Sequence, residues 1–134
     1  MRLNYLAVAT TGIVLFLIGG VWYMLFSRQW SAATGIAASQ VGPGKNAYIY
    51  VVALAAALLA AYALARIIAW RAHPSAGDGA MIGILLGVLI FAPLTLMDYG
   101  FERRPLALFL VNTGYVVVAL TAGGAILGAW RPRR

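Results

Sequence analysis

Long, uninterrupted apolar segments dominate the pattern of hydrophobic and polar positions along this chain. Four of them, separated by shorter polar stretches, cover residues 5–26, 47–70, 80–97 and 106–130. A helix rises 1.5 Å per residue, so the first segment reaches ~33 Å, enough to cross a hydrocarbon core of ~30 Å. None of the segments shows the alternation of polar and apolar residues that a membrane strand requires. The pattern predicts an all-α membrane protein, a four-transmembrane-helix bundle with short loops, in a single integral membrane domain over residues 1–134.

The composition supports lipid as the solvent for most of the molecular surface. Of the 134 residues, 63% are hydrophobic and 10% are charged, whereas a soluble domain carries about 25% charged residues. The net charge of +7 indicates contact with an anionic lipid bilayer. It does not indicate nucleic-acid binding, because no basic face interleaved with aromatic residues is present. We therefore expect the lipid bilayer, and not nucleic acid, as a partner.

Residue types that hold metals or perform thiol chemistry are nearly absent. The chain has no cysteine and a single histidine, His73, which lies in a polar stretch beside Pro74. The lack of cysteine excludes disulfide scaffolds, thiolate metal sites and thiol redox chemistry. One histidine is too few for a His-rich metal site, and no nucleophile–base triad is present. We therefore expect no metal, no cofactor and no catalytic residue.

The stretches between the apolar segments hold residues that interrupt helices. The sequences "VGPGK" at 41–45 and "RAHPSAGDG" at 71–79 combine glycine with proline, which favours turns. Pro93 lies inside the third segment, where it removes one backbone donor and bends the predicted helix. The first segment is too long for a signal peptide, whose apolar core spans about 7–15 residues. We expect it to be a retained helix.

Cationic residues divide unequally between the two ends of the predicted helices. With four spans both termini lie on one side, and that side holds Arg2, Arg66, Arg71, Arg131, Arg133 and Arg134. The other side holds Arg28, Lys45, Arg103 and Arg104, partly offset by Asp98 and Glu102. Interfacial tryptophans flank the spans on the outer side (Trp22, Trp30) and on the inner side (Trp70, Trp130). Because an excess of Lys and Arg marks the cytoplasmic side, we expect both termini in the cytoplasm and the protein in a bacterial inner (plasma) membrane.

Small residues recur at four-residue intervals in the last three predicted helices. They are Ala53, Ala57, Ala61, Ala65 and Ala69 in the second helix, Gly83 and Gly87 in the third, and Gly124 and Gly128 in the fourth. Within a bilayer, helices associate through close backbone approach and dispersion, and small-xxx-small spacings permit that approach. The spacing favours packing inside one bundle, and an oligomer interface is the alternative.

The charged turn "DYGFERRP" at 98–105 is the first candidate for a functional site. Asp98 and Glu102 stand four residues apart and would share a helix face, but Gly100 and Pro105 predict that the helix frays after Tyr99. We favour a neutralised turn at the membrane surface, in which carboxylates pair with Arg103, Arg104 or Arg28. A polar vestibule at the outer mouth of the bundle is the alternative, because paired carboxylates can carry protons.

Asn112 is the second candidate, because it lies about two turns, ~10 Å, into the fourth helix. An amide at that depth requires hydrogen-bond partners on neighbouring helices. Candidate partners are Thr95 and Asp98 on the third helix, or Thr10, Thr11 and Tyr23 on the first. Tyr115 follows Asn112 on the same helix face. We interpret Asn112 as a contact between helices. In the alternative, the vestibule is lined by Asp98, Glu102, Arg103, Arg104, Asn112 and Tyr115.

Several short motifs resemble the family called domain of unknown function 1761, small four-helix membrane proteins of bacteria and fungi. They are "NYLAV", "GGVWY", Trp30, "FERRPLALFLVNTGY" and "GAILGAW". The motifs lie toward both ends of the chain, and the middle is similar mainly in hydropathy. The resemblance implies a four-helix fold and implies no activity. Members often have an asparagine near the position of Asp98 and a histidine after the Gly-Tyr pair, where this chain has Val116.

These observations give three hypotheses for function. We favour a non-enzymatic bundle that acts by association, as a homo-oligomer or as an accessory subunit of a larger membrane complex. The second hypothesis is a small transporter or channel with the polar outer vestibule. The third is a membrane enzyme for a lipophilic substrate, similar to the integral membrane glutathione transferases. The sequence "FERR" with Asn112 is only weakly similar to their arginine-rich motifs.

Overall fold

The computed structural model describes residues 3–42 and 44–130, and within them every regular element is a helix. Four helical segments are long and apolar enough to cross a membrane: α1 (Tyr5–Leu25), α3 (Ala47–Ile68), the continuous segment Ala76–Glu102, and α6 (Leu106–Ala129). This confirms the predicted all-α, four-span fold of an integral membrane protein. The cationic residues Arg2, Arg131, Arg133 and Arg134 lie outside the described residues.

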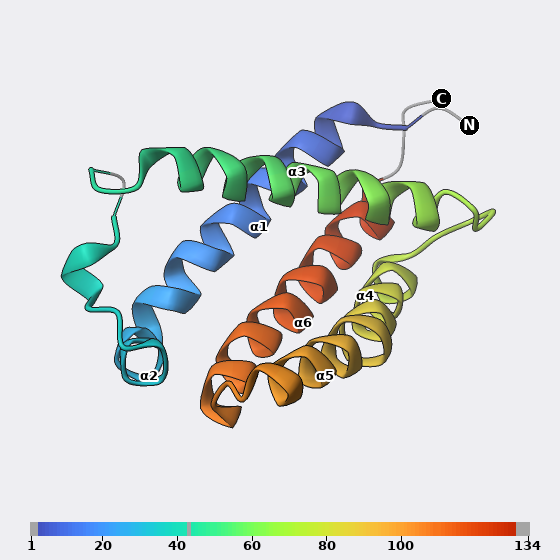
Figure 1. The fold of residues 1–134 in the computed structure, drawn as a ribbon. Helices are drawn as coiled ribbons and strands as arrows, with labels where there is room; N and C mark the ends of the chain where they lie inside the picture. Colours follow the sequence, from blue (N-terminus) through green and yellow to red (C-terminus); the bar gives the residue numbers. More distant parts are fainter. Residues whose placement is uncertain (1–2, 43, 131–134) are drawn as a thin grey trace.

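The first connection contains helices that the sequence pattern did not indicate. At Phe26 the backbone leaves the α1 geometry, and the short helix α2 (Ser27–Thr34) follows at once. Gly35 ends α2 in the left-handed conformation, with φ of 74°. The single turn η1 (Ala38–Gln40) completes the connection. Figure 1 shows α2 turned steeply away from the direction of α1 at the far end of that helix.

The third long helix begins at Ala76, four residues before the expected start at residue 80. It starts as α4 (Ala76–Leu85), and its N-terminus is fixed by a reciprocal capping box between Ser75 and Asp78. The Asp78 backbone N–H donates to Ser75 Oγ at 3.1 Å, and the Ser75 backbone N–H donates to Asp78 Oδ2 at 3.0 Å. Asp78 also pairs with Arg71 at 2.9 Å. The carboxylate therefore satisfies backbone donors of the first turn and ties the preceding loop to it.

Pro93 distorts the same helix one turn before its own position. The segment η2 (Leu86–Phe91) is a π-helix, and the N–H of Ala92 donates to the carbonyl of Gly87, five residues earlier. A proline supplies no N–H, and its ring crowds the carbonyl four residues before it, so the widened turn accommodates both effects. The helix continues beyond the distortion as α5 (Ala92–Glu102).

The end of α5 differs from the expected fraying after Tyr99. The helix continues to Glu102, so Asp98 and Glu102 lie on helical turns and the connection to α6 is short. Arg103, with φ of 57°, reverses the chain, and its N–H donates to the Gly100 carbonyl. The N–H of Arg104 donates to the Tyr99 carbonyl at 2.9 Å. These two bonds form a Schellman motif, which satisfies the last carbonyls of the helix without a glycine at the left-handed position.

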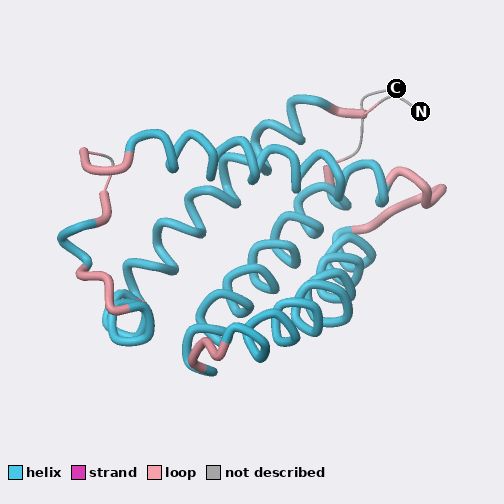
Figure 2. Tube along the Cα trace, in the orientation of Figure 1, coloured by secondary structure: helices cyan, strands magenta, loops and turns pink. Residues whose placement is uncertain are grey.

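Three of the long helices lie side by side, and the fourth crosses them. Figure 1 shows α1, α6 and the α4–α5 helix running in similar directions, with α3 across α1, α6 and α4. The start of α1 and the end of α6 lie at one end of the molecule, and the α5–α6 turn lies at the other (Figure 2). Among the described residues the backbones of α1 and α5 do not approach each other, and each packs on α6.

The most buried residues lie where α1, α3 and α6 cross. Ala61 is fully buried, and Leu64 and Leu15 are 1% and 2% exposed. A Cβ added at Gly12 would stand 2.9 Å from the Cα of Leu58, so α1 and α3 approach through their backbones. Thr11 is also fully buried, and its hydroxyl has no hydrogen-bond partner among the described atoms. Small side chains therefore set the distances between these helices.

Glycines occupy the closest approach of α4 to α6. A Cβ at Gly83 would meet the carbonyl of Leu120, and one at Gly124 would meet the carbonyl of Gly79. A Cβ at Gly128 would meet the carbonyl of Ser75. In α3, Ala57, Ala61 and Ala65 are buried, while Ala53 is exposed.

Candidate functional site

Asn112 joins three helices through its side-chain amide. On one side the hydroxyl of Tyr23, from α1, donates to Asn112 Oδ1 at 2.8 Å. On the other side Asn112 Nδ2 donates to the hydroxyl of Tyr99, from α5, at 2.7 Å. We call Tyr23, Asn112 and Tyr99 the amide bridge. Because the backbones of α1 and α5 lie apart, this bridge links the two helices by side chains through α6.

The α5–α6 turn places Tyr99 opposite Asn112. The two helices are antiparallel and joined by a short connection, so residues at equal distances from the turn face each other. Tyr99 and Asn112 lie on either side of Pro105 at nearly equal spacing. The Tyr99 ring also meets Phe109 edge-on, with ring centroids 6.3 Å apart. These contacts hold the phenol group where it accepts the amide N–H.

Beside the amide bridge, an aromatic side chain of each of the helices α1 and α6 packs on a glycine of the other. The Trp22 indole lies over Gly114, where an added Cβ would stand 2.8 Å from the ring, and its Nε1–H donates to the Val111 carbonyl at 2.9 Å. From α6, the Tyr115 hydroxyl lies over Gly19 of α1 and donates to the Leu15 carbonyl at 3.0 Å.

Tyr23 stands between these two contacts and packs edge-on against Tyr115, with centroids 5.7 Å apart. The amide bridge therefore lies within an aromatic interface in which each hydroxyl or indole N–H has a partner on the facing helix. This interface fixes the C-terminal half of α1 against α6.

Arg104 covers the Tyr99 end of the amide bridge. Its guanidinium carbon lies 5.1 Å from the centroid of the Tyr99 ring, a cation–π distance. The same guanidinium forms an ion pair with Glu102, and both side chains are about half exposed. The pairing of Glu102 with an arginine of the turn agrees with the neutralised-turn interpretation. At this exposure the pair contributes little to stability, about 0–1 kcal/mol.

The structure brings together some of the six predicted vestibule residues and separates others. Asn112, Glu102 and Arg104 belong to one chain of contacts through Tyr99. Tyr115 is bound to α1 and not to the charged turn. Asp98 is exposed on α5 and is not a partner of Asn112, and neither is Thr95. Arg103 is exposed and serves as the left-handed residue of the helix end.

Sequence reasoning named Tyr23 as a candidate partner of Asn112 and missed Tyr99. The missed signal is the hairpin geometry, which places Tyr99 opposite Asn112 once the short α5–α6 connection is recognised. Expecting the helix to fray after Tyr99 concealed it, because a frayed residue has no defined facing partner. The role of Trp22 was also missed, since an interfacial position gave no reason to assign a backbone acceptor on α6.

The chemistry of this site is hydrogen bonding between neutral groups. Two phenols and one primary amide supply no nucleophile–base pair, and the hydroxyl of Tyr23 and both polar atoms of Asn112 are engaged. In the part of the chain that the structure describes, no three His, Cys, Asp or Glu residues are grouped as a metal site requires. His73 is exposed in the α3–α4 connection, away from the bridge. The arrangement is suited to holding helices together.

Comparison with known proteins identifies the family and nothing more specific. No curated protein and no solved structure matches the chain. The model of the family described as protein of unknown function (DUF1761) matches residues 6–128, from the second residue of α1 to the last turn of α6. The match takes in all four spans and confirms the family suggested by the motifs. The chain therefore belongs to the DUF1761 family of proteins of unknown function.

Proposed function

We propose that this membrane protein acts by association, with α5 contacting a second copy of the chain or a subunit of a larger membrane complex. The supporting observation is the lack of burial on α5. No residue of that helix is buried within the chain. Within an apolar 18-residue stretch of each span, 11% of residues are buried in the third span, against 22% to 28% in the other three. A helix with so little internal packing has a large surface for contacts with other molecules.

The exposed surface of α5 includes an apolar stripe. Leu94, Met97 and Phe101 follow the spacing of one helix face, and they are 55%, 51% and 86% exposed. Exposed apolar residues are also compatible with lipid, so the stripe alone does not select a protein partner. Asp98 favours a protein partner, because its exposed carboxylate lies next to the stripe, one turn from the helix end. A carboxylate beside acyl chains is costly, whereas a protein surface can supply donors.

The glycines of α4 and α6 are not available for contacts with another subunit, which favours α5 as the contact surface. Gly83, Gly124 and Gly128 are buried between α4 and α6 within the chain. They are therefore not free for contacts with another subunit. Packing within the chain takes up these glycines, whereas no residue of α5 is buried.

The polar residues also favour association over transport. The Asn112 amide is engaged on both sides by tyrosines, and Glu102 is paired with Arg104. These groups are directed at one another and not toward a cavity. We further propose that the protein lies in a bacterial inner membrane with both termini in the cytoplasm, which the distribution of Lys and Arg supports.

Cysteine cross-linking in native membranes tests the proposed contact. The chain has no cysteine, so each introduced thiol is unique. Met97→Cys places a thiol on the stripe, and Leu59→Cys places one on an exposed apolar position of α3, where Leu59 is 68% exposed. With an oxidant, we expect Met97→Cys to form a disulfide-linked dimer. A larger adduct would identify a different cysteine-containing subunit.

The Leu59→Cys variant is the matched control for random collision in the bilayer. It should remain at the mass of a single chain under the same oxidation. Equal cross-linking of the two variants, or none at Met97→Cys and likewise none at Leu94→Cys, would contradict an α5 interface.

A further inference from the structure

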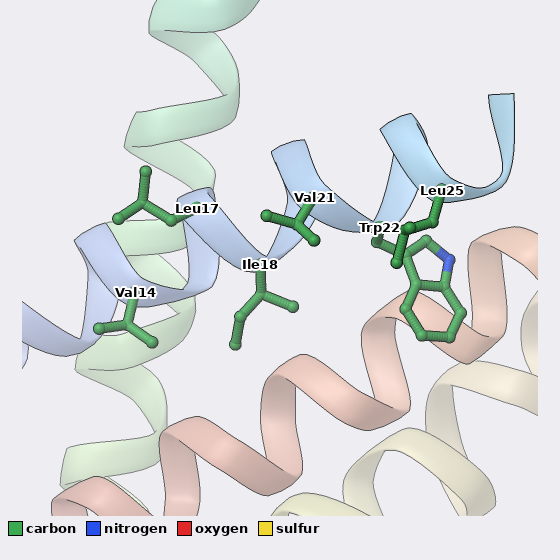
Figure 3. A pocket seen from close by; sticks show the side chains of 6 residues that line it. All are labelled: Val14, Leu17, Ile18, Val21, Trp22 and Leu25. Atoms are coloured by element: carbon green, nitrogen blue, oxygen red, sulfur yellow. The ribbon is translucent and has the colours of Figure 1, made fainter.

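A groove runs along α1 between residues 14 and 25. Its cavity volume is about 310 Å³. Figure 3 shows its lining side chains, all of them apolar: Val14, Leu17, Ile18, Val21, Trp22 and Leu25. These residues form two rows with four-residue spacing, and such rows are ridges with a groove between them. The volume is within the range of small-ligand sites, about 300–1,000 Å³.

The groove has a fixed wall toward the C-terminal end of α1. Trp22 is held there by the hydrogen bond from Nε1–H to the Val111 carbonyl and by packing of its indole on Gly114. Phe26 packs on the same indole, with ring centroids 4.7 Å apart. A side chain with these contacts does not swing into the groove to fill it. The groove is therefore a preformed apolar surface within the span.

The chain beyond the groove is cationic and contains no acid. Arg28 is exposed on α2, three residues after Leu25, so their Cα atoms are at most ~11 Å apart. The first acidic residue of the sequence is Asp78. The ion pairs of residues 3–42 and 44–130 are Arg71–Asp78 and Arg104–Glu102, and neither involves Arg28. The connection that follows the groove therefore carries cations and no acid, which favours an anionic ligand.

We propose that the groove and Arg28 together form a binding site for one anionic phospholipid of the bilayer. An acyl chain lies between the two ridges of α1, where every contact is apolar. The phosphate accepts hydrogen bonds from the Arg28 guanidinium, whose planar fork matches phosphate oxygens. Trp22 lies at the depth where an amphipathic ring meets the headgroup region. The site is on α1, whose backbone lies apart from that of α5, so it is independent of the proposed association.

Native mass spectrometry tests this site on the full chain. The protein is reconstituted in vesicles of equal phosphatidylglycerol and phosphatidylcholine with identical acyl chains, then released with its bound lipid. We expect the wild type to retain one phosphatidylglycerol per chain in preference to phosphatidylcholine. Arg28→Gln should lower that preference about fivefold, the effect of removing one cation near the membrane surface. Arg28→Lys should retain most of it.

Two further variants test whether a change in lipid retention reflects loss of this site, a general change in charge near the membrane, or misfolding. Lys45→Gln removes another cation from the same connection and should leave lipid retention unchanged. Val21→Trp fills the groove and should lower retention of both lipids, with helicity checked by circular dichroism. Equal retention of the two lipids by the wild type would overturn the proposal. So would unchanged retention in Arg28→Gln, a result that does not depend on the folding of Val21→Trp.

Discussion

Asn112 shows how one polar side chain organises a bundle whose interior is otherwise apolar. Its amide holds Tyr23 and Tyr99 at 2.8 and 2.7 Å on opposite sides. In hydrocarbon, each of these groups would be left without a partner if the bridge opened. Hydrogen bonds between membrane helices contribute about 0.6–2 kcal/mol each. The bridge therefore links α1, α6 and α5 through a single side chain.

Asn112→Leu removes both hydrogen bonds while keeping a similar side-chain volume. We expect the free energy of unfolding to fall by about 1–3 kcal/mol, since two bonds are lost and two phenols lose a partner. Unfolding in mixed micelles titrated with a denaturing detergent measures the change. Tyr48→Phe is the control, because Tyr48 is 75% exposed. A loss no larger than that of Tyr48→Phe would show that the bridge does not stabilise the fold.

Arg103 occupies a backbone conformation that its side chain disfavours. Its φ of 57° lies in the left-handed region, which costs a residue with a Cβ about 1 kcal/mol relative to glycine. Arg103→Gly should therefore raise the free energy of unfolding by about that amount. Arg103→Ala removes the charge but keeps the Cβ, and should give no such gain. The same unfolding titration compares them, and equal effects of the two variants would assign the change to charge.

The elements show which features of the chain could be predicted from sequence. Four long apolar runs predicted four spans because hydrophobicity along a helix is a property of the run itself. The end of α5 could not be predicted so well. Gly100 and Pro105 are ordinary signals of a helix end, but Arg103 took the left-handed position and the helix continued to Glu102. Tertiary contacts of Tyr99 with Asn112 and Phe109 stabilise those last turns.

The candidate site could likewise be predicted only in part. Asn112 was found from sequence because an amide inside an apolar run is conspicuous. Its partners depend on which faces of three helices meet, and that depends on helix rotation. Pro93 adds a further unknown, because the π-helical turn at Leu86–Phe91 rotates α5 relative to α4. The predicted vestibule joined Asp98 to Asn112, whereas the rotation places Tyr99 there.

Contact between α4 and α6 is set by glycine backbones. Gly83→Ala would drive a Cβ into the Leu120 carbonyl, and backbone cannot move aside without separating the helices. We expect a loss of about 1–3 kcal/mol in the free energy of unfolding. Gly20→Ala is the matched control in α1, since nothing lies within 4 Å of its added Cβ. The idea fails if the two substitutions have the same effect in the detergent titration.

For the whole molecule, the arrangement of cations predicts orientation in the membrane. Lys45 is exposed in the connection before α3, and His73 is exposed in the connection after it. With cytoplasmic termini, Lys45→Cys should react with a membrane-impermeant maleimide in intact cells. His73→Cys should react only after the cells are permeabilised. The reverse labelling pattern would place the termini outside.

We propose that another protein chain covers the exposed surface of α5. The most direct test of this proposal is counting subunits by stepwise photobleaching of the fluorescently tagged protein in native membrane nanodiscs at low density. We predict two or more bleaching steps per particle, or one step with another membrane protein present at a fixed ratio. Phe101→Lys, on the stripe, should shift the count toward one tagged chain without a partner. A wild-type protein that shows single steps and no accompanying protein would show that α5 is not covered by another chain.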